Sequence, residues 1–287
     1  GEMLWHWGKE SGKELFQPYR IALLPDSLLV TDTGNGRVLE IERETRSVRK
    51  RWRGLQNPRS AALTKEGFLL VAEEGKGRLV TLTSDSQVNW EYTPSHPGSR
   101  PHYAEVTAEG SVLFADAGLH QVCEISLKGE ILWSWGEQGE SGNGTHNLKE
   151  PSFAHRLEDG STLIADTGNH RLVWVRPEEE PHLIKGNLSD PLISPMHVEI
   201  LPNGEWLVYS VSPEKIVRLS RRGENIWSAS LYSSNPQSMP AAPVNATASE
   251  DRWILDMDRL QELEGGPNQA AEITVEQELQ SDSSQPV

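Results

Sequence analysis

The sequence predicts an all-β protein, a six-bladed β-propeller whose last blade is closed by the N-terminal strand. Three observations predict this fold: a proline-led repeat of about 40 to 50 residues, a Gly- and Asn-rich hairpin within each repeat, and a duplicate of an internal strand at residues 1–8. A strand-rich repeat of this size is typical of one four-stranded propeller blade.

Five proline-led segments open the repeats, and each continues as a short apolar strand. They begin at Pro18, Pro58, Pro101, Pro151 and Pro195, and a sixth, degenerate segment begins at Pro240. The residues that follow are rich in Val, Ile, Leu, Thr and Trp with a period of two, which favours strands over pairs of helices. We expect the proline-led strand to be the innermost of four in each blade.

The second and third strands of each repeat are joined by a hairpin, most clearly in Asp32-Thr-Gly-Asn-Gly-Arg37 and Asp166-Thr-Gly-Asn-His-Arg171. Gly and Asn suit turns that require a positive φ. We expect the aspartates to accept backbone hydrogen bonds in these turns and Arg37, Arg78 and Arg171 to pair with the acids. These motifs therefore predict structural turns rather than calcium sites.

The closure of the ring is predicted from one near-duplicate. Residues 1–8 read GEMLWHWG and residues 129–136 read GEILWSWG. The second string is expected to be the outer strand of the third blade, and the last repeat has no fourth strand of its own. Residues 1–8 are therefore expected to complete the sixth blade, so that the propeller spans 1–264 and leaves no open edge. Residues 265–287 are polar and acidic, and we expect them to form a flexible tail.

The strings DTGNGRVLEI at 32–41 and DTGNHRLVWV at 166–175 resemble NHL repeats, and the resemblance covers about residues 1–264. It implies an NHL-type six-bladed propeller, as in RNA-binding NHL domains, the peptidylglycine α-amidating lyase and exported bacterial propellers. In that lyase, zinc-binding histidines follow the blade-opening prolines. Only His102 matches that pattern here, since the other positions hold Tyr19, Arg59, Ser152, Met196 and Ala241. The resemblance therefore implies the fold without the zinc histidines of the lyase.

The charge of the chain limits its partners. The formal net charge is −15, which argues against a nucleic acid, because phosphate binding needs a clustered positive surface. No apolar run is long enough to span a membrane. The single cysteine, Cys123, excludes an internal disulfide. We expect a monomer whose compartment is unknown, with export favoured over the cytoplasm because NHL relatives in bacteria are often exported.

The candidate site lies on the innermost strands, which line the central channel. The predicted ligand-binding residues of the channel and its rim are Tyr19, Arg20, Arg59, His102, Tyr103, Glu105, His155, His197 and Glu199. Among them, Glu105, His155 and Glu199 fall four residues after their prolines in three adjacent blades. They could coordinate a divalent metal such as calcium or zinc, or act as an acid/base set. Alternatively, His155 bridges two carboxylates in a structural role.

Two classes of function follow from this site. The favoured one is a non-catalytic scaffold that binds a protein, glycan or small molecule at the channel mouth or top face, since no serine-triad elbow, phosphate loop or HExxH motif is present. The alternative is a metal-assisted hydrolase or lyase with its site in the channel of blades three to five. The longest insertion between blades, residues 136–146, is expected to be a mobile connector.

Overall fold

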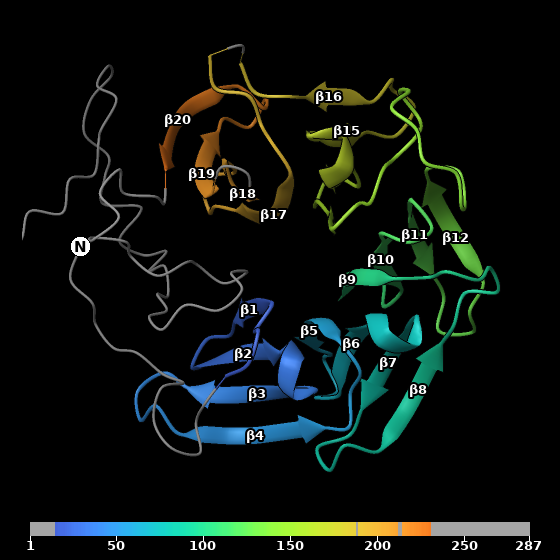
Figure 1. Ribbon diagram of the computed structural model, residues 1–287, viewed down its shortest axis with the longest axis vertical. Helices are drawn as coiled ribbons and strands as arrows, with labels where there is room; N and C mark the ends of the chain where they lie inside the picture. The colour runs from blue at the N-terminus through green and yellow to red at the C-terminus, as the bar shows by residue number, and fades with distance from the viewer. Residues whose placement is uncertain (1–14, 188, 212–213, 231–287) are drawn as a thin grey trace, which may run out of the picture.

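The computed structural model of the chain describes residues 15–187, 189–211 and 214–230. These residues form five four-stranded antiparallel sheets, each with its strands in sequence order. Figure 1 shows the sheets around a common centre, with β1, β5, β9 and β17 innermost. The all-β propeller is thus confirmed, with five blades described rather than six. The predicted sixth blade, from residues 240–264 and 1–8, and the predicted tail at 265–287 lie outside the described residues.

The first three blades are each built from four short strands. The first blade consists of β1 (Arg20–Leu23), β2 (Ser27–Asp32), β3 (Arg37–Glu42) and β4 (Val48–Arg53). The second consists of β5 (Pro58–Leu63), β6 (Leu69–Glu73), β7 (Arg78–Leu82) and β8 (Val88–Tyr92). The third consists of β9 (Pro101–Val106), β10 (Val112–Asp116), β11 (Gln121–Ile125) and β12 (Ile131–Trp135). The string GEILWSWG therefore contains an outer strand, as predicted.

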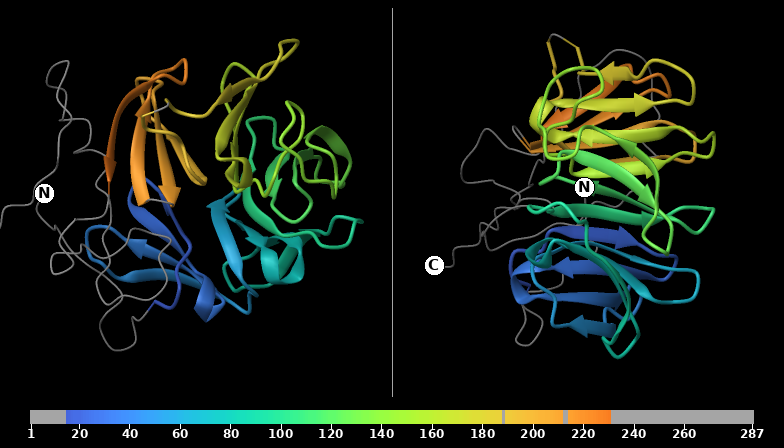
Figure 2. Two further views of the ribbon diagram at one scale, coloured as in Figure 1. Left: turned by 45° about the horizontal axis from the view of Figure 1, so that its top comes forward. Right: turned by 90° about the vertical axis from the view of Figure 1, so that its right-hand side faces the viewer.

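The remaining two described blades complete the arc. The fourth blade consists of β13 (Phe153–Arg156), β14 (Thr162–Asp166), β15 (Arg171–Val175) and β16 (His182–Ile184). The fifth consists of β17 (Pro195–Ile200), β18 (Trp206–Val211), β19 (Glu214–Leu219) and β20 (Asn225–Ser230). Figure 2 shows the blades succeeding one another in sequence order, from the first blade in blue to the fifth in orange. The proline-led strands are the innermost in every described blade.

The hydrophobic core fills the spaces between neighbouring blades. Between the first two blades, Leu29 and Trp52 pack with Leu69 and Val71, and all four side chains are buried. The second strands β2, β6, β10 and β14 are buried along their whole length. For β6, β10 and β14 this follows because their blades have a described neighbour on each side. This packing holds the innermost strands at fixed positions around the channel.

The hairpins between second and third strands contain the short 3-10 turns η1 (Thr33–Asn35), η2 (Glu74–Lys76) and η3 (Thr167–Asn169). Each turn ends in a left-handed residue, as Gly36 does with a φ of 58°. A Cβ at Gly36 would lie 2.5 Å from the carbonyl oxygen of Leu55, so glycine is needed there for space as well as for φ.

The acidic residue before each turn has the predicted structural role. Asp32 and Asp166 each accept a hydrogen bond from a backbone N–H of the loop that leads into their own blade, from Phe16 and Lys149 respectively. The predicted ion pairs are present: Arg37 with Asp32, Arg78 with Glu73, and Arg171 with Asp166, at 2.6, 2.6 and 2.7 Å. The hairpins therefore attach each blade to its incoming loop.

The insertion between the third and fourth blades differs from the mobile connector that the sequence suggested. Arg171, which is 1% exposed, donates hydrogen bonds to the carbonyl oxygens of Asn143, Gly144 and Asn147. Asn169 donates a further bond to the carbonyl oxygen of Gly142. The loop is fastened to the fourth blade because its carbonyls replace water as acceptors for a buried guanidinium group.

Candidate functional site

The predicted site residues lie at three levels along the channel. We call the end where the innermost strands begin the turn end, since η1, η2 and η3 lie there, and the opposite end the far end. The first level, at the turn end, holds Tyr19, Arg59 and His102. The second level holds Arg20, Tyr103 and His197. The third level, nearest the far end, holds Glu105, His155 and Glu199.

The second level is a packed cluster inside the channel. Arg20 is 7% exposed, and its guanidinium carbon lies 4.9 Å from the ring centre of Tyr103 and 5.8 Å from that of Phe153. The Tyr103 and Phe153 rings are 4.6 Å apart, and His197 meets Phe153 edge-on at 4.7 Å. Stacked aromatic rings and a cation over their faces stabilise such an arrangement.

The hydrogen bond between Arg20 and His197 fixes the state of the imidazole. Arg20 Nη1 lies 2.6 Å from His197 Nδ1, and arginine can only donate, so Nδ1 is the acceptor and Nε2 carries the proton. Burial, followed by the positive charge of Arg20, lowers the pKa of His197 to about 4. His197 is therefore neutral at physiological pH and serves as an acceptor for the buried cation.

The third level contains a histidine–carboxylate pair. His155 Nδ1 lies 2.8 Å from Glu105 Oε2, and the same oxygen accepts a hydrogen bond from the Tyr103 hydroxyl at 3.0 Å. Glu105 Oε1 accepts the backbone N–H of Arg156 at 2.9 Å. Burial opposes the charged form of His155, but the bond to Glu105 and the charges of Glu105 and Glu199 outweigh it, so its pKa is raised. Glu105 thus orients an imidazole whose Nε2 faces away from the pair.

The predicted three-ligand metal set does not assemble in this structure. Glu105, His155 and Glu199 occupy one register position, opposite Leu113, Leu163 and Leu207 of the second strands. However, Glu199 lies beside His197, with 3.5 Å between its Oε2 and His197 Nε2. Among the described residues, no group of three or more His, Cys, Asp or Glu side chains is arranged to hold a metal ion. The level instead consists of the Glu105–His155 pair and an adjacent carboxylate.

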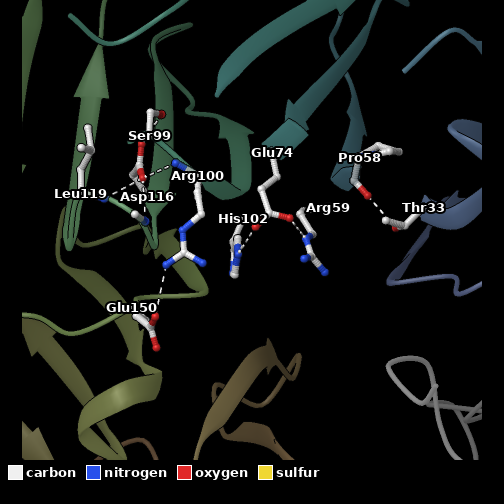
Figure 3. A network of polar contacts seen from close by, with 11 residues as sticks. Thr33, Pro58, Arg59, Glu74, Ser99, Arg100, His102, Asp116, Leu119 and Glu150 are labelled. Atoms are coloured by element: carbon white, nitrogen blue, oxygen red, sulfur yellow. Dashed lines mark hydrogen bonds and ion pairs between the residues drawn. The ribbon is translucent and has the colours of Figure 1, made fainter. Parts of the chain in front are cut away.

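The turn end carries a second cluster, shown in Figure 3, in which Arg59, Glu74 and His102 point toward one another. Arg59 Nε donates to Glu74 Oε2 at 2.5 Å, and its guanidinium carbon lies 4.3 Å from the ring centre of Tyr19. His102 Nε2 is 3.5 Å from Glu74 Oε1, and the Tyr19 ring meets His102 edge-on at 6.0 Å. We call these four residues the turn-end cluster.

The electrostatics of the turn-end cluster set the charge of each member. Burial alone would raise the pKa of Glu74, but the hydrogen bonds from His102 and Arg59 outweigh it and lower this pKa to about 2. Burial and the nearby charge of Arg59 lower the pKa of His102 against the pull of Glu74. Burial also raises the pKa of Tyr19. At neutral pH the cluster therefore holds one ion pair, a neutral imidazole and a neutral phenol.

Glu74 is the site residue that the sequence analysis missed. It is the first residue of η2, a position held by Thr33 and Thr167 in the equivalent turns. Those threonine hydroxyls donate to the carbonyl oxygens of Pro58 and Pro195, at 2.6 and 2.7 Å, and so fasten each blade to the next. The sequence did contain a signal for Glu74. A carboxylate in place of threonine departs from the pattern of the repeat and introduces charge at the channel mouth.

The fold and these clusters define the chain as a β-propeller with a polar, aromatic channel. The family model for the outer membrane protein assembly factor BamB matches residues 49–180, which is less than half of the chain. No curated protein matches the sequence at a significant level. Among the described residues, no helix is long and apolar enough to cross a membrane.

Solved structures of other β-propellers are similar to this chain. Virginiamycin B lyase from Staphylococcus aureus has a TM-score of 0.59 and 15% identity, with 78% of this chain and 72% of the lyase covered. A gluconolactonase from Xanthomonas campestris has a TM-score of 0.58 and 15% identity, covering 74% and 75%. The Cps50 (Swd1) propeller domain of Myceliophteria thermophila has a TM-score of 0.51 and 14% identity, covering 74% and 86%. At these identities the similarity establishes the fold alone.

Proposed function

We propose that this protein is a non-catalytic binding propeller that holds a small anionic or sugar-like ligand at the turn end of its channel. The observation that carries the proposal is the arrangement of Arg59 over Tyr19, with Nε alone bonded to Glu74. The guanidinium plane is fixed by this stacking and by the ion pair, and its side chain is 25% exposed. A held arginine fork is well suited to bidentate recognition of carboxylates and of vicinal hydroxyls.

The neighbouring groups support a polar ligand at this end. The Nδ1 atom of His102 is buried without a hydrogen-bond partner among the described residues, and Nε2 has only the long 3.5 Å contact with Glu74 Oε1. A buried polar atom without a partner destabilises the protein, and a bound ligand that supplies a hydrogen bond would remove this penalty. Because the imidazole is neutral, it can accept from a hydroxyl as well as donate. A few polar and charged groups beside aromatic rings are the usual make-up of a small-molecule site, and this set suits an anionic or sugar-like ligand.

The finer architecture belongs to the same proposal. We propose that the chain is an NHL-type six-bladed propeller in which residues 240–264 and 1–8, outside the described part of the chain, supply the sixth blade. The support is the repeat of GEILWSWG, the string containing β12, as GEMLWHWG. Deleting residues 1–8 is expected to unfold the domain, and an unchanged melting temperature would refute the closure. Export from the cytoplasm, supported by the partial match to BamB, is proposed with it.

The ligand proposal is tested with sugar probes. Thermal-shift and calorimetric titrations of the full chain with glucuronate, gluconate and glucose are expected to show preferential stabilisation by the two acids. Arg59→Lys should weaken that binding roughly tenfold or more, since hydrogen bonds to charged groups contribute about 1.5–3 kcal/mol. Arg53→Lys, at an exposed position of outer strand β4, is the matched control. Equal binding by both variants, or no binding by any probe, would refute the proposal.

Elemental analysis separates this function from the metal-assisted hydrolase or lyase. A stoichiometric divalent metal in purified protein, lost in His155→Ala, would favour the enzyme. Metal-free protein that remains stable in chelator would favour the binding module. The two hypotheses also differ in location, because the turn-end cluster and the Glu105–His155 pair lie at opposite ends of the innermost strands.

A further inference from the structure

The far end of the channel carries two hydrogen-bond acceptors, His155 Nε2 and the Glu199 carboxylate, and the only protein donor near them in the described part of the chain is His197 Nε2, 3.5 Å from Glu199 Oε2. We propose that His155 Nε2 and the Glu199 carboxylate form a second site, which binds a primary ammonium group. This site lies at the opposite end of the channel from the proposed ligand of the turn-end cluster and has the opposite charge preference, so neither proposal depends on the other.

The orientation of His155 is the first argument. His155 Nδ1 donates to the Glu105 carboxylate at 2.8 Å, and in the neutral ring this leaves Nε2 as the nitrogen without a proton. Both oxygens of Glu105 are already occupied, by the Tyr103 hydroxyl and the Arg156 backbone N–H. The pair is therefore rigid, and the His155 side chain is 36% exposed. When the ring is neutral, its Nε2 is presented as a fixed acceptor.

Glu199 supplies the second acceptor and the charge. It lies on β17, beside β13, at the register position of His155, and its side chain is 49% exposed. No lysine or arginine in the described part of the chain forms an ion pair with it. The nearest cations are engaged elsewhere, Arg20 with His197 and Arg156 with Glu124. Glu199 therefore keeps most of its capacity to accept hydrogen bonds.

An alkylammonium ion fits these groups better than a metal ion does. It provides three N–H donors and one positive charge, which match a neutral imidazole nitrogen and a carboxylate. A metal would need at least three ligands, and the described residues contain no such group. The net charge of −15 further favours approach of a cation.

Protons compete with the ammonium ion for this site. The charges of Glu105 and Glu199 favour any positive charge here, which is why the pKa of His155 is raised despite burial. The titratable groups that act on His155 are Glu105 on β9 and His197 and Glu199 on β17, and the Tyr103 hydroxyl shares the Glu105 oxygen that His155 contacts. The nearby cations are held elsewhere, Arg20 on His197 and Arg156 on Glu124. By linkage, a bound ammonium ion must lower the pKa of His155, so the binding can be followed at this one residue.

The test is an NMR titration of histidine-labelled full-length protein with butylammonium, with butanol as the neutral control. We expect saturable shifts at His155 with butylammonium only, and a lower pKa of His155 in its presence. Glu199→Gln should weaken binding roughly tenfold to a hundredfold, because it replaces a charge-assisted bond. Glu158→Gln, an exposed position on the same blade as His155, should leave it unchanged.

Two further ligands show which kind of amine the site prefers, and three results would refute the proposal. Putrescine represents free small amines, and Nα-acetyl-lysine methylamide represents a lysine side chain of a protein; tighter binding of one indicates which source the site prefers. Equal shifts with butanol and butylammonium, or binding unchanged in Glu199→Gln, would overturn the proposal. So would calcium or zinc saturating the same His155 signal while butylammonium does not.

Discussion

Arg20 of the first blade donates a hydrogen bond across the channel to His197 of the fifth, with 2.6 Å between Nη1 and Nδ1. The bond joins strands β1 and β17, which are separated by three blades in the sequence. Because arginine remains protonated even when burial lowers its pKa, the histidine must stay neutral to accept. The two residues thus close the middle of the channel as one unit.

Replacing Arg20 with leucine is expected to destabilise the domain. The change removes the guanidinium that lies against the rings of Tyr103 and Phe153 and leaves His197 Nδ1 without its donor. An acceptor left unpaired inside a protein costs about 1–3 kcal/mol, so urea unfolding should show a loss of at least this size. The pKa of His197, about 4 in the native protein, should rise because a positive neighbour is lost.

Arg53→Leu, at an exposed position of the outer strand β4, is the control for the Arg20 substitution. Surface changes of this kind alter stability by about 0.5 kcal/mol or less. If the two variants unfold at the same urea concentration, the bond between the first and fifth blades has no role in stability. A His197 pKa that stays near 4 in Arg20→Leu would likewise show that Arg20 does not set it.

The threonine at the start of the 3-10 turns gives a second prediction. Thr33→Val and Thr167→Val keep the side-chain shape but remove the donors to the carbonyl oxygens of Pro58 and Pro195. Each change should lower the free energy of unfolding by about 1–2 kcal/mol, with the larger effect at the more deeply buried Thr33. Thr45→Val, whose hydroxyl bonds only at the exposed surface, should change it little. Chemical denaturation of the three variants side by side measures the contrast.

Much of the fold could be predicted because its signals are local and repeated. Pro58, Pro101 and Pro195 each begin an innermost strand, and the turns that follow buried second strands carry the expected acids and arginines. A periodic sequence reports such features several times, so one degenerate copy does not hide them. The number of blades depends on the copies with the weakest pattern, near Pro240 and residues 1–8, and those lie outside the described residues.

The site was less predictable, because its chemistry depends on contacts between blades. The level of Glu105, His155 and Glu199 followed from counting along the strands and agrees with the register. Counting along the strands could not show which side chains contact each other. In the structure Glu105 pairs with His155, while Glu199 lies next to His197. The length of each side chain decides which residues meet across the channel. Arg20 is long enough to reach the fifth blade and to fill space that a shorter side chain would leave open.

Arg171 gives a third prediction, on the loop between the third and fourth blades. Lysine at this position keeps the charge beside Asp166 but cannot reproduce the fork that binds the carbonyl oxygens of Asn143, Gly144 and Asn147. Arg171→Lys should lower the free energy of unfolding by about 2–4 kcal/mol and expose the loop to proteolysis. The matched change Arg78→Lys, whose partners are the carboxylates Glu73 and Glu91, should cost about 1 kcal/mol. Equal protease sensitivity in both variants would contradict the role assigned to Arg171.

The raised pKa of His155 predicts a dependence of stability on pH. Since the folded state binds the proton more tightly than the unfolded chain, the stabilisation is fully present below the ordinary histidine pKa of 6.5 and is lost as the pH rises through the higher folded value. In Glu105→Gln the hydrogen-bonded charge is gone and burial dominates, so the pKa of His155 should fall below 6.5 and the pH dependence should reverse in sign. Histidine NMR titrations of both proteins measure the two pKa values, and urea unfolding at several pH values between 5.5 and 8.5 measures the stability. A His155 pKa that does not fall in Glu105→Gln would mean that Glu105 is not the partner that holds the proton.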